Sequence, residues 1–195
     1  MASARAAHTA TLLPSGRVLF AGGFARDESN VAGVELYDPI SAKSTPIGSM
    51  RTPRYGHTAT MLANGKVLLA GGYNGVGAYL RSAELFDEAS GTFASAGAMR
   101  AARADHVSVK LNDGRVLLIG GVGDGWSFLE SVELYDPATS SFSTTGPMKF
   151  ARTSHAAVRL ADGRVFVTGG HQGRRVANLT VSQNQFNLKT TRATL

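Results

Sequence analysis

The sequence predicts an all-β fold made of four repeated units, and three observations support this prediction. A set of motifs recurs every 49 residues, so that His8, His57, His106 and His155 keep one register. Each unit contains alternating or continuous apolar segments separated by glycine-containing turns, as expected for short antiparallel strands. No segment shows the sustained 3.6-residue period of an amphipathic helix.

The first two strands of each unit follow from a hairpin pattern. "HTATLL", beginning at His8, alternates small or polar residues with apolar ones, as a strand with two different faces does. The turns "PSGR", "ANGK", "NDGR" and "ADGR" follow, and their glycines supply the positive φ that a tight hairpin demands. Apolar runs such as "VLLAGG" then predict a strand that is covered on both faces.

A double glycine ends each second strand, where we expect backbone geometry or close packing to leave no room for a Cβ. These structural positions are Gly22 and Gly23, Gly71 and Gly72, Gly120 and Gly121, and Gly169 and Gly170.

The third and fourth strands complete each unit. "VELYD" predicts a third strand, "PATSS" a turn, and "SFSTTG" a shorter and more polar fourth strand. Four antiparallel strands in about 50 residues describe one blade of a β-propeller. We expect a single propeller domain over residues 1–195, with blades at approximately 5–50, 54–99, 103–148 and 152–195. The last blade is expected to be degenerate, because its projected third strand reads "TVSQNQF".

These motifs resemble the Kelch-repeat family, and especially bacterial Kelch repeats. The shared features are the apolar run, the double glycine, "VELYDP" and spaced aromatic residues, which here are Tyr37, Phe86, Tyr135, Phe93 and Phe142. Phenylalanine occupies the last two of these positions, where many family members carry tryptophan. The resemblance covers residues 5–170 and implies blades of a propeller ring, which in this family mostly contains six or seven blades.

Three full units and a degenerate fourth are fewer than such a ring requires. An open arc would leave an apolar blade face and unpaired strand edges at each end. We therefore expect that the chain is a piece of a longer propeller, that it forms a compact small ring, or that it associates with a second copy.

Composition and charge narrow the classes of partner. The formal net charge is +6 and the pI about 10, but the positive charges are scattered. We therefore expect no specific nucleic-acid binding, and an acidic partner fits the net charge.

The absence of cysteine excludes disulfides, thiolate metal sites and a cysteine nucleophile. No signal-peptide pattern or membrane-length apolar run is present in this chain, so we expect a soluble protein. Its compartment stays open, and it would be secreted or on the cell surface as part of a longer exported protein.

The phased polar residues have a structural and a functional interpretation. A ring formed by His8, His57, His106 and His155 could hold a metal, but strict repetition favours hydrogen bonds within a blade or to its neighbour. Arginines and glutamates recur in the same way and predict charge-assisted pairs, for which a contact across blades is one arrangement. The residues in this structural role are Arg54, Arg103, Glu35, Glu84 and Glu133. On this interpretation Arg152 loses the glutamate of its own unit, which Ser182 replaces.

The loops after the double glycines differ from unit to unit and share one face with the inter-blade connections. Loops on a rigid scaffold commonly carry binding, and exposed aromatic and arginine residues commonly anchor it. The candidate binding residues are Tyr73, Tyr79, Arg81, Trp126, Phe128, His171, Arg174 and Arg175. The alternative for each of them is ordinary loop packing.

The sequence therefore predicts a non-enzymatic binding module that presents this face to a protein, peptide or glycan. A second hypothesis is a propeller enzyme or carbohydrate-active domain of the galactose-oxidase-like type. Copper-radical chemistry is excluded, because the resemblance implies that it needs a cysteine crosslinked to a tyrosine. A third hypothesis is an architectural fragment of a longer propeller. No nucleophilic triad, HExxH motif or phosphate-binding loop is present, so we predict no catalytic residue and no cofactor.

Overall fold

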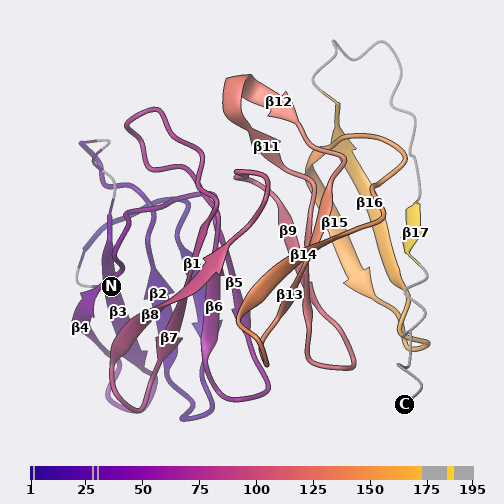
Figure 1. Ribbon diagram of the computed structural model, residues 1–195. Coiled ribbons are helices and arrows are strands. Elements are labelled where there is room, and N and C mark those ends of the chain that lie inside the picture. The colour runs from indigo at the N-terminus through magenta and orange to yellow at the C-terminus, as the bar shows by residue number, and fades with distance from the viewer. Residues whose placement is uncertain (2, 28, 30, 173–183, 187–195) are drawn as a thin grey trace.

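The computed structural model describes residues 1, 3–27, 29, 31–172 and 184–186, the last three in their backbone only. The fold is all-β, and four sheets follow one another along the chain (Figure 1). The first blade contains β1 (Thr9–Leu12), β2 (Val18–Ala21), β3 (Gly33–Asp38) and β4 (Lys43–Ser49). The second contains β5 (Thr58–Met61), β6 (Val67–Ala70), β7 (Ser82–Asp87) and β8 (Thr92–Ala98).

The third blade carries an additional small hairpin. Its four main strands are β9 (Val107–Lys110), β10 (Val116–Ile119), β13 (Val132–Asp136) and β14 (Ser141–Thr145). The hairpin lies between β10 and β13 and consists of β11 (Val122–Gly123), the 3₁₀ turn η1 (Asp124–Trp126) and β12 (Ser127–Phe128). The fourth blade has three described strands, β15 (Thr153–Arg159), β16 (Val165–His171) and β17 (Asn184–Phe186).

Every blade is an up-and-down antiparallel sheet whose strands are paired in chain order. The first strands of successive blades contact one another, β1 with β5, β5 with β9 and β9 with β15. This arrangement places the first strands on the inner side of the arc and the fourth strands at its outside, as in a propeller. The predicted all-β fold with propeller blades is confirmed.

The second strand of each interior blade, β6 or β10, is buried on both faces because a blade lies on each side of it. Val67 and Leu69 of β6 pack against the first blade, whereas Leu68 and Ala70 of the same strand pack against the third. All four side chains are at most 1% exposed. This packing explains why the sequence is continuously apolar here instead of alternating, and it confirms the prediction of a strand covered on both faces.

The outward faces of the first and last described blades lack such a cover. Leu12 is 67% exposed and Val158 is 55% exposed. Val18 and Phe20 are only half-buried, although the residues at the same positions of the second blade, Val67 and Leu69, are completely buried. The two end blades of the described arc therefore display the apolar side chains that an interior blade hides.

The double glycines allow neighbouring blades to approach closely. Gly71 and Gly72 have φ values of 65° and 102°, and the Gly72 amide donates a hydrogen bond to the Arg103 carbonyl of the next blade at 2.8 Å. A Cβ on Gly71 would lie 2.4 Å from that same carbonyl oxygen. At Gly169, in the last described blade, a Cβ would meet no described atom within 4 Å. In the blades that have a described neighbour, the next blade therefore fills the space that a side chain at this position would need.

We predict that Leu69→Ala destabilises the protein by about 2–5 kcal/mol, because it leaves a cavity between two blades. Leu12→Ala should change stability by less than about 1 kcal/mol, because the leucine side chain is mostly exposed. Urea denaturation of both variants measures the difference. Equal losses would show that the junctions between blades are not the main source of stability.

Candidate functional site

Buried ion pairs lie at the same end of each of the first three blades, near the double glycines. We call this the upper end, because it is at the top in Figure 1. Arg54 is fully buried, and its Nη2 donates to Glu84 Oε1 at 2.8 Å. Its Nη1 donates to the carbonyls of Gly71 and Ser82 at 2.7 and 3.0 Å. Equivalent pairs join Arg5 to Glu35 at 2.7 Å and Arg103 to Glu133 at 2.8 Å. Each pair lies inside one blade, so the arrangement across blades is wrong for these three pairs.

The glutamates of the second and third blades also hold the connection from the preceding blade. Glu84 accepts hydrogen bonds from the backbone amides of Arg51 and Thr52 at 2.8 and 3.3 Å. Glu133 accepts equivalent bonds from the amides of Arg100 and Ala101. A buried carboxylate with a charged partner and two amide donors is well compensated for its lost hydration. The ion pairs therefore position the inter-blade loops on the upper face.

Arg152 keeps part of this arrangement in the fourth blade. It is buried, and its Nη1 donates to the carbonyl of Gly169 at 2.7 Å. Ser182, the residue at the position of the missing glutamate, lies outside the described residues.

The phased histidines connect neighbouring blades. Nε2 of His57 lies 2.9 Å from Oγ1 of Thr9, and Nε2 of His106 lies 3.0 Å from Oγ1 of Thr58. Burial, reinforced by the charge of Arg54, lowers the pKa of His57 to about 3, and burial places the pKa of His106 well below its usual value. Burial also lowers the pKa of His155 to about 4. These three imidazoles are neutral at pH 7.

The histidines do not converge on a common centre. His8, His57, His106 and His155 occupy successive blades, and within the described residues no three histidine, aspartate or glutamate side chains are grouped so as to hold a metal ion. The ring of four metal ligands is therefore not the observed arrangement.

Five aromatic side chains form a continuous row across the upper face of the first three blades. Adjacent rings meet edge to face in the order Phe24, Tyr55, Tyr73, Tyr79 and Trp126, with centroid separations of 5.3, 5.5, 5.1 and 6.4 Å. The first four are half-buried, and Trp126 is 76% exposed. We call these five residues the aromatic row.

Backbone pairing holds the middle of the aromatic row in place. Tyr55 and Tyr73 exchange backbone hydrogen bonds of 3.1 and 2.8 Å, and Tyr73 also bridges to Tyr79. These bridges extend the β5–β6 hairpin beyond the double glycine and join the inter-blade connection to the variable loop. The tyrosines are therefore carried by paired backbone, which gives the row a rigid support.

Trp126 ends the row in a strained conformation. It lies in η1 with a φ of 60°, which is unfavourable for a bulky side chain. Such strain persists where the surrounding structure imposes it, and it is concentrated at functional sites. The small hairpin β11–η1–β12, which carries Trp126, lies at the top of the molecule in Figure 1.

The structure brings together only some of the predicted binding residues. Tyr73, Tyr79 and Trp126 belong to the aromatic row, whereas Phe128 and His171 form a separate pair with ring centroids 5.2 Å apart. Arg81 is exposed in the loop that carries Tyr79. Arg174 and Arg175 lie outside the described residues.

Sequence reasoning missed two members of the row, Phe24 and Tyr55. Tyr55 stands two residues before His57, at a position that other units fill with Ala6, Ala104 or Thr153. This departure from the repeat was the available signal, because scaffold positions repeat and this one does not. Phe24 directly follows the first double glycine, in a loop already recognised as variable.

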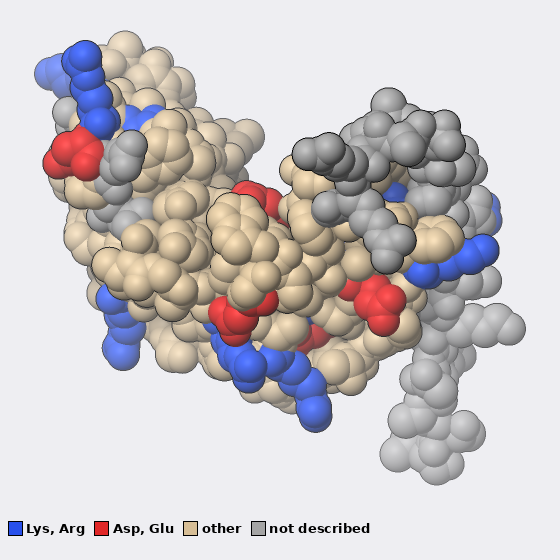
Figure 2. All heavy atoms as spheres, turned by 90° about the horizontal axis from the view of Figure 1, so that it is seen from above, with Lys and Arg blue, Asp and Glu red and all other residues tan. Residues whose placement is uncertain are grey.

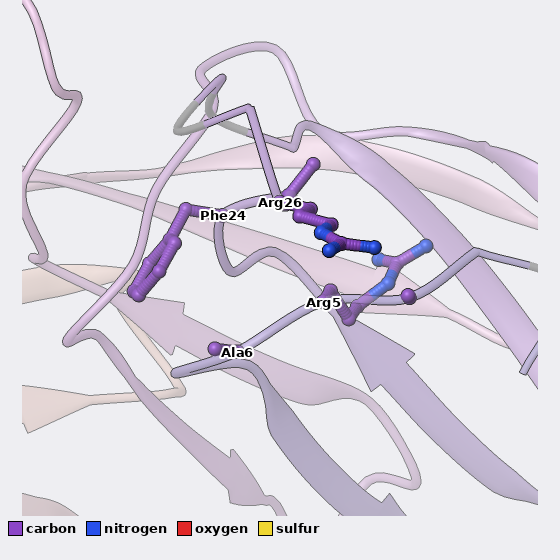
Figure 3. Close-up of a pocket in the computed structure, with 6 residues that line it drawn as sticks. Arg5, Ala6, Phe24 and Arg26 are labelled. Carbon is purple, nitrogen blue, oxygen red and sulfur yellow. The ribbon is translucent and has the colours of Figure 1, made fainter.

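A small pocket adjoins the Phe24 end of the row. It has a volume of about 270 Å³ and is lined by residues 4–6 and 24–26. Arg26 and Arg5 lie together on one side of it, and the ring of Phe24 points away to the other side (Figure 3). Arg5 is engaged with Glu35, so the exposed guanidinium of Arg26 is the more accessible of the two cations.

Comparison with known proteins agrees with this architecture. Residues 104–149, which contain the four main strands of the third blade, match the Kelch motif. The motifs of this matched segment recur in phase in the other units, along residues 5–170.

A solved structure with the same fold supports the assignment. The structure of YjhT, a Kelch-type propeller, superposes with a TM-score of 0.73 over 85% of this chain, at 16% sequence identity. At this identity the likeness establishes the fold alone, and the chain spans about three fifths of the length of YjhT. No curated protein matches the chain significantly. Within its described part, no helix has the length and hydropathy needed to cross a membrane.

We predict that Glu84→Ala destabilises the protein by about 3–5 kcal/mol, because it leaves the buried Arg54 without its counter-charge. The matched control is Glu88→Ala, which removes the partly exposed pair with Arg17 and should cost less than about 1 kcal/mol. The midpoints of urea denaturation measure the loss of stability in both variants. A midpoint for Glu84→Ala equal to that of the control would disprove a stabilising role for the buried pair.

We predict that stability falls on acidification below about pH 6.5. The folded-state pKa of His57 is depressed to about 3, so between these pH values the unfolded chain binds a proton that the folded chain does not. At pH 5 this histidine alone costs about 2 kcal/mol relative to pH 7. His57→Gln should reduce the difference between the urea midpoints at pH 7 and pH 5. An unchanged difference would exclude His57 as a source of the acid sensitivity.

Proposed function

We propose that this chain is a binding module whose contact surface is the aromatic row. The observation that carries the proposal is the row itself, five aromatic rings in mutual contact on one loop face, ending in the exposed Trp126. Tyrosine and tryptophan dominate binding energy at interfaces, because a large apolar ring is buried at little cost in conformational entropy.

The supporting scaffold strengthens the proposal. Buried ion pairs hold the inter-blade connections, and backbone bridges hold Tyr55, Tyr73 and Tyr79. A surface that is ordered before binding loses less entropy when the complex forms. The aromatic row is therefore organised in advance of its ligand.

An extended ligand fits this geometry best. The row begins after β2 and ends in the hairpin of the third blade, so the contact surface spans three blades. Kelch repeats commonly mediate protein interactions. We therefore favour a protein or peptide over a glycan as the ligand.

We predict that Trp126→Ala abolishes binding of the ligands that the wild-type chain binds and leaves the thermal melt unchanged. The reason is that the exposed indole contributes to binding and little to the core. Peptide and glycan arrays probed with labelled wild-type and variant chains measure this loss. Ile40→Ala is the matched control, since Ile40 is 97% exposed in the β3–β4 turn at the opposite end of the blades. If Trp126→Ala kept every ligand of the wild type, the aromatic row would not be the contact surface.

A further inference from the structure

Two carboxylates lie beside the exposed end of the aromatic row. Asp105 follows the connection into the third blade, and Asp124 begins η1, two residues before Trp126. Burial raises the pKa of the Tyr79 phenol, and the neighbouring tyrosines and the charges of both aspartates add to this effect. Both carboxylates are therefore electrostatic neighbours of the rings that would contact a ligand.

The backbone fixes the position of Asp105. Its φ is 51°, and the residues at the same position of the other blades, Ala7, Gly56 and Ser154, have φ values of 51°, 61° and 53°. The fold therefore imposes a left-handed conformation here, whichever residue is present. Asp105 holds this conformation while donating its amide to the Gly56 carbonyl at 2.8 Å, which joins the second blade to the third.

The glycine at position 56 makes room for the carboxylate. A Cβ on Gly56 would lie 2.6 Å from Oδ1 of Asp105. The carboxylate consequently lies against Gly56, the residue immediately after Tyr55 of the aromatic row. An alanine at position 56, as at position 7, would displace it.

No described cation compensates the Asp105 carboxylate. Partial burial raises its pKa, and among the described residues no charged group acts to lower it. Viewed from above, most basic side chains lie towards the outline of the molecule, and several acidic ones lie nearer its middle (Figure 2). Asp105 and Asp124 thus supply two carboxylates near this end of the row, although the chain carries a net charge of +6.

Aromatic faces add to this preference for a positive group. The face of an aromatic ring is electronegative, and tryptophan is the strongest partner for an ammonium or guanidinium group. Edge-to-face packing between Tyr79 and Trp126, at 84°, leaves ring faces that are not stacked on each other. A lysine can lay its apolar stem on such rings while its ammonium reaches a carboxylate.

We infer that Trp126, Tyr79 and Asp105 form a subsite for a lysine side chain of a protein partner. This inference rests on the proposed function, since it names the chemical group that the exposed end of the aromatic row recognises. The aromatic rings bind the alkyl stem and the cation, and Asp105 orients the ammonium. Asp124 adds negative charge at the same end. The net positive charge of the chain repels a basic group at long range. Recognition of the lysine therefore depends on short-range contacts in the subsite.

The experiment uses Trp126 as its own reporter, because it is the only tryptophan in the sequence. Its fluorescence is recorded while the full chain is titrated with the peptide Gly-Ala-Lys-Ala-Gly, and then with the same peptide carrying norleucine in place of lysine. We expect a saturable change with the lysine peptide and at least a tenfold weaker response with norleucine.

The variant Asp105→Asn tests the carboxylate directly. Asparagine tolerates a left-handed φ well, so the fold is retained, and an unchanged thermal melt checks this. We expect the lysine peptide to bind about tenfold more weakly to this variant. Asp113→Asn is the matched control, because Asp113 lies in the β9–β10 hairpin at the opposite end of the blades. A second variant, Asp105→Gly, copies the residue of the second blade and should behave like Asp105→Asn.

Three outcomes would overturn the inference. The norleucine peptide could bind as well as the lysine peptide, Asp105→Asn could bind like the wild type, or a neutral oligosaccharide could saturate the Trp126 signal while the lysine peptide does not. In each case a loss of array ligands by Trp126→Ala would still support the aromatic row as the contact surface. Failure of the lysine subsite is thereby distinguished from failure of the proposed function.

Discussion

The structure depends on burial of the apolar faces of each blade against its neighbours. A four-stranded sheet with Val67, Leu68, Leu69 and Ala70 in one strand has no side that can face water, so it is stable only between two similar sheets. Three such junctions form the core of the described arc, and each contains residues from two blades. The double glycines follow from the same constraint, because the next blade approaches too closely for a side chain.

Polar contacts at the upper ends of the blades add direction to this packing. Hydrophobic burial alone does not determine how far one blade is rotated relative to the next. The hydrogen bonds between Thr9 and His57 and between Thr58 and His106 cross the junctions, and the buried Arg54–Glu84 pair holds the connecting chain. These groups specify the positions of the loops, and through them the geometry of the upper face.

Repetition separates the scaffold from the candidate site. The arginines, glutamates and histidines recur in phase because each blade solves the same packing problem. Residues of the aromatic row occupy positions that differ between units. Tyr55, for example, is replaced by Ala6 and Ala104 at the equivalent positions of the first and third units. The strained Trp126 and the Asp105 carboxylate belong to this second group, and neither residue is part of the apolar clusters between blades. A protein that repeats its scaffold can vary these positions without disturbing its core.

The strands, the hairpin turns, the double glycines and the propeller blades could be predicted from the sequence, because they depend on local periodicity and on turn chemistry repeated four times. The phased arginines and glutamates also indicated that they would pair. The folded chain was needed to show that the pairs lie inside blades, and that Phe24, Tyr55 and Trp126 belong to one row. Those relations join residues up to about a hundred positions apart, and they arise only when three blades pack and bring their loops to a common face. The position of the Asp105 carboxylate beside Gly56 was decided in the same way, by the close contact of two neighbouring blades.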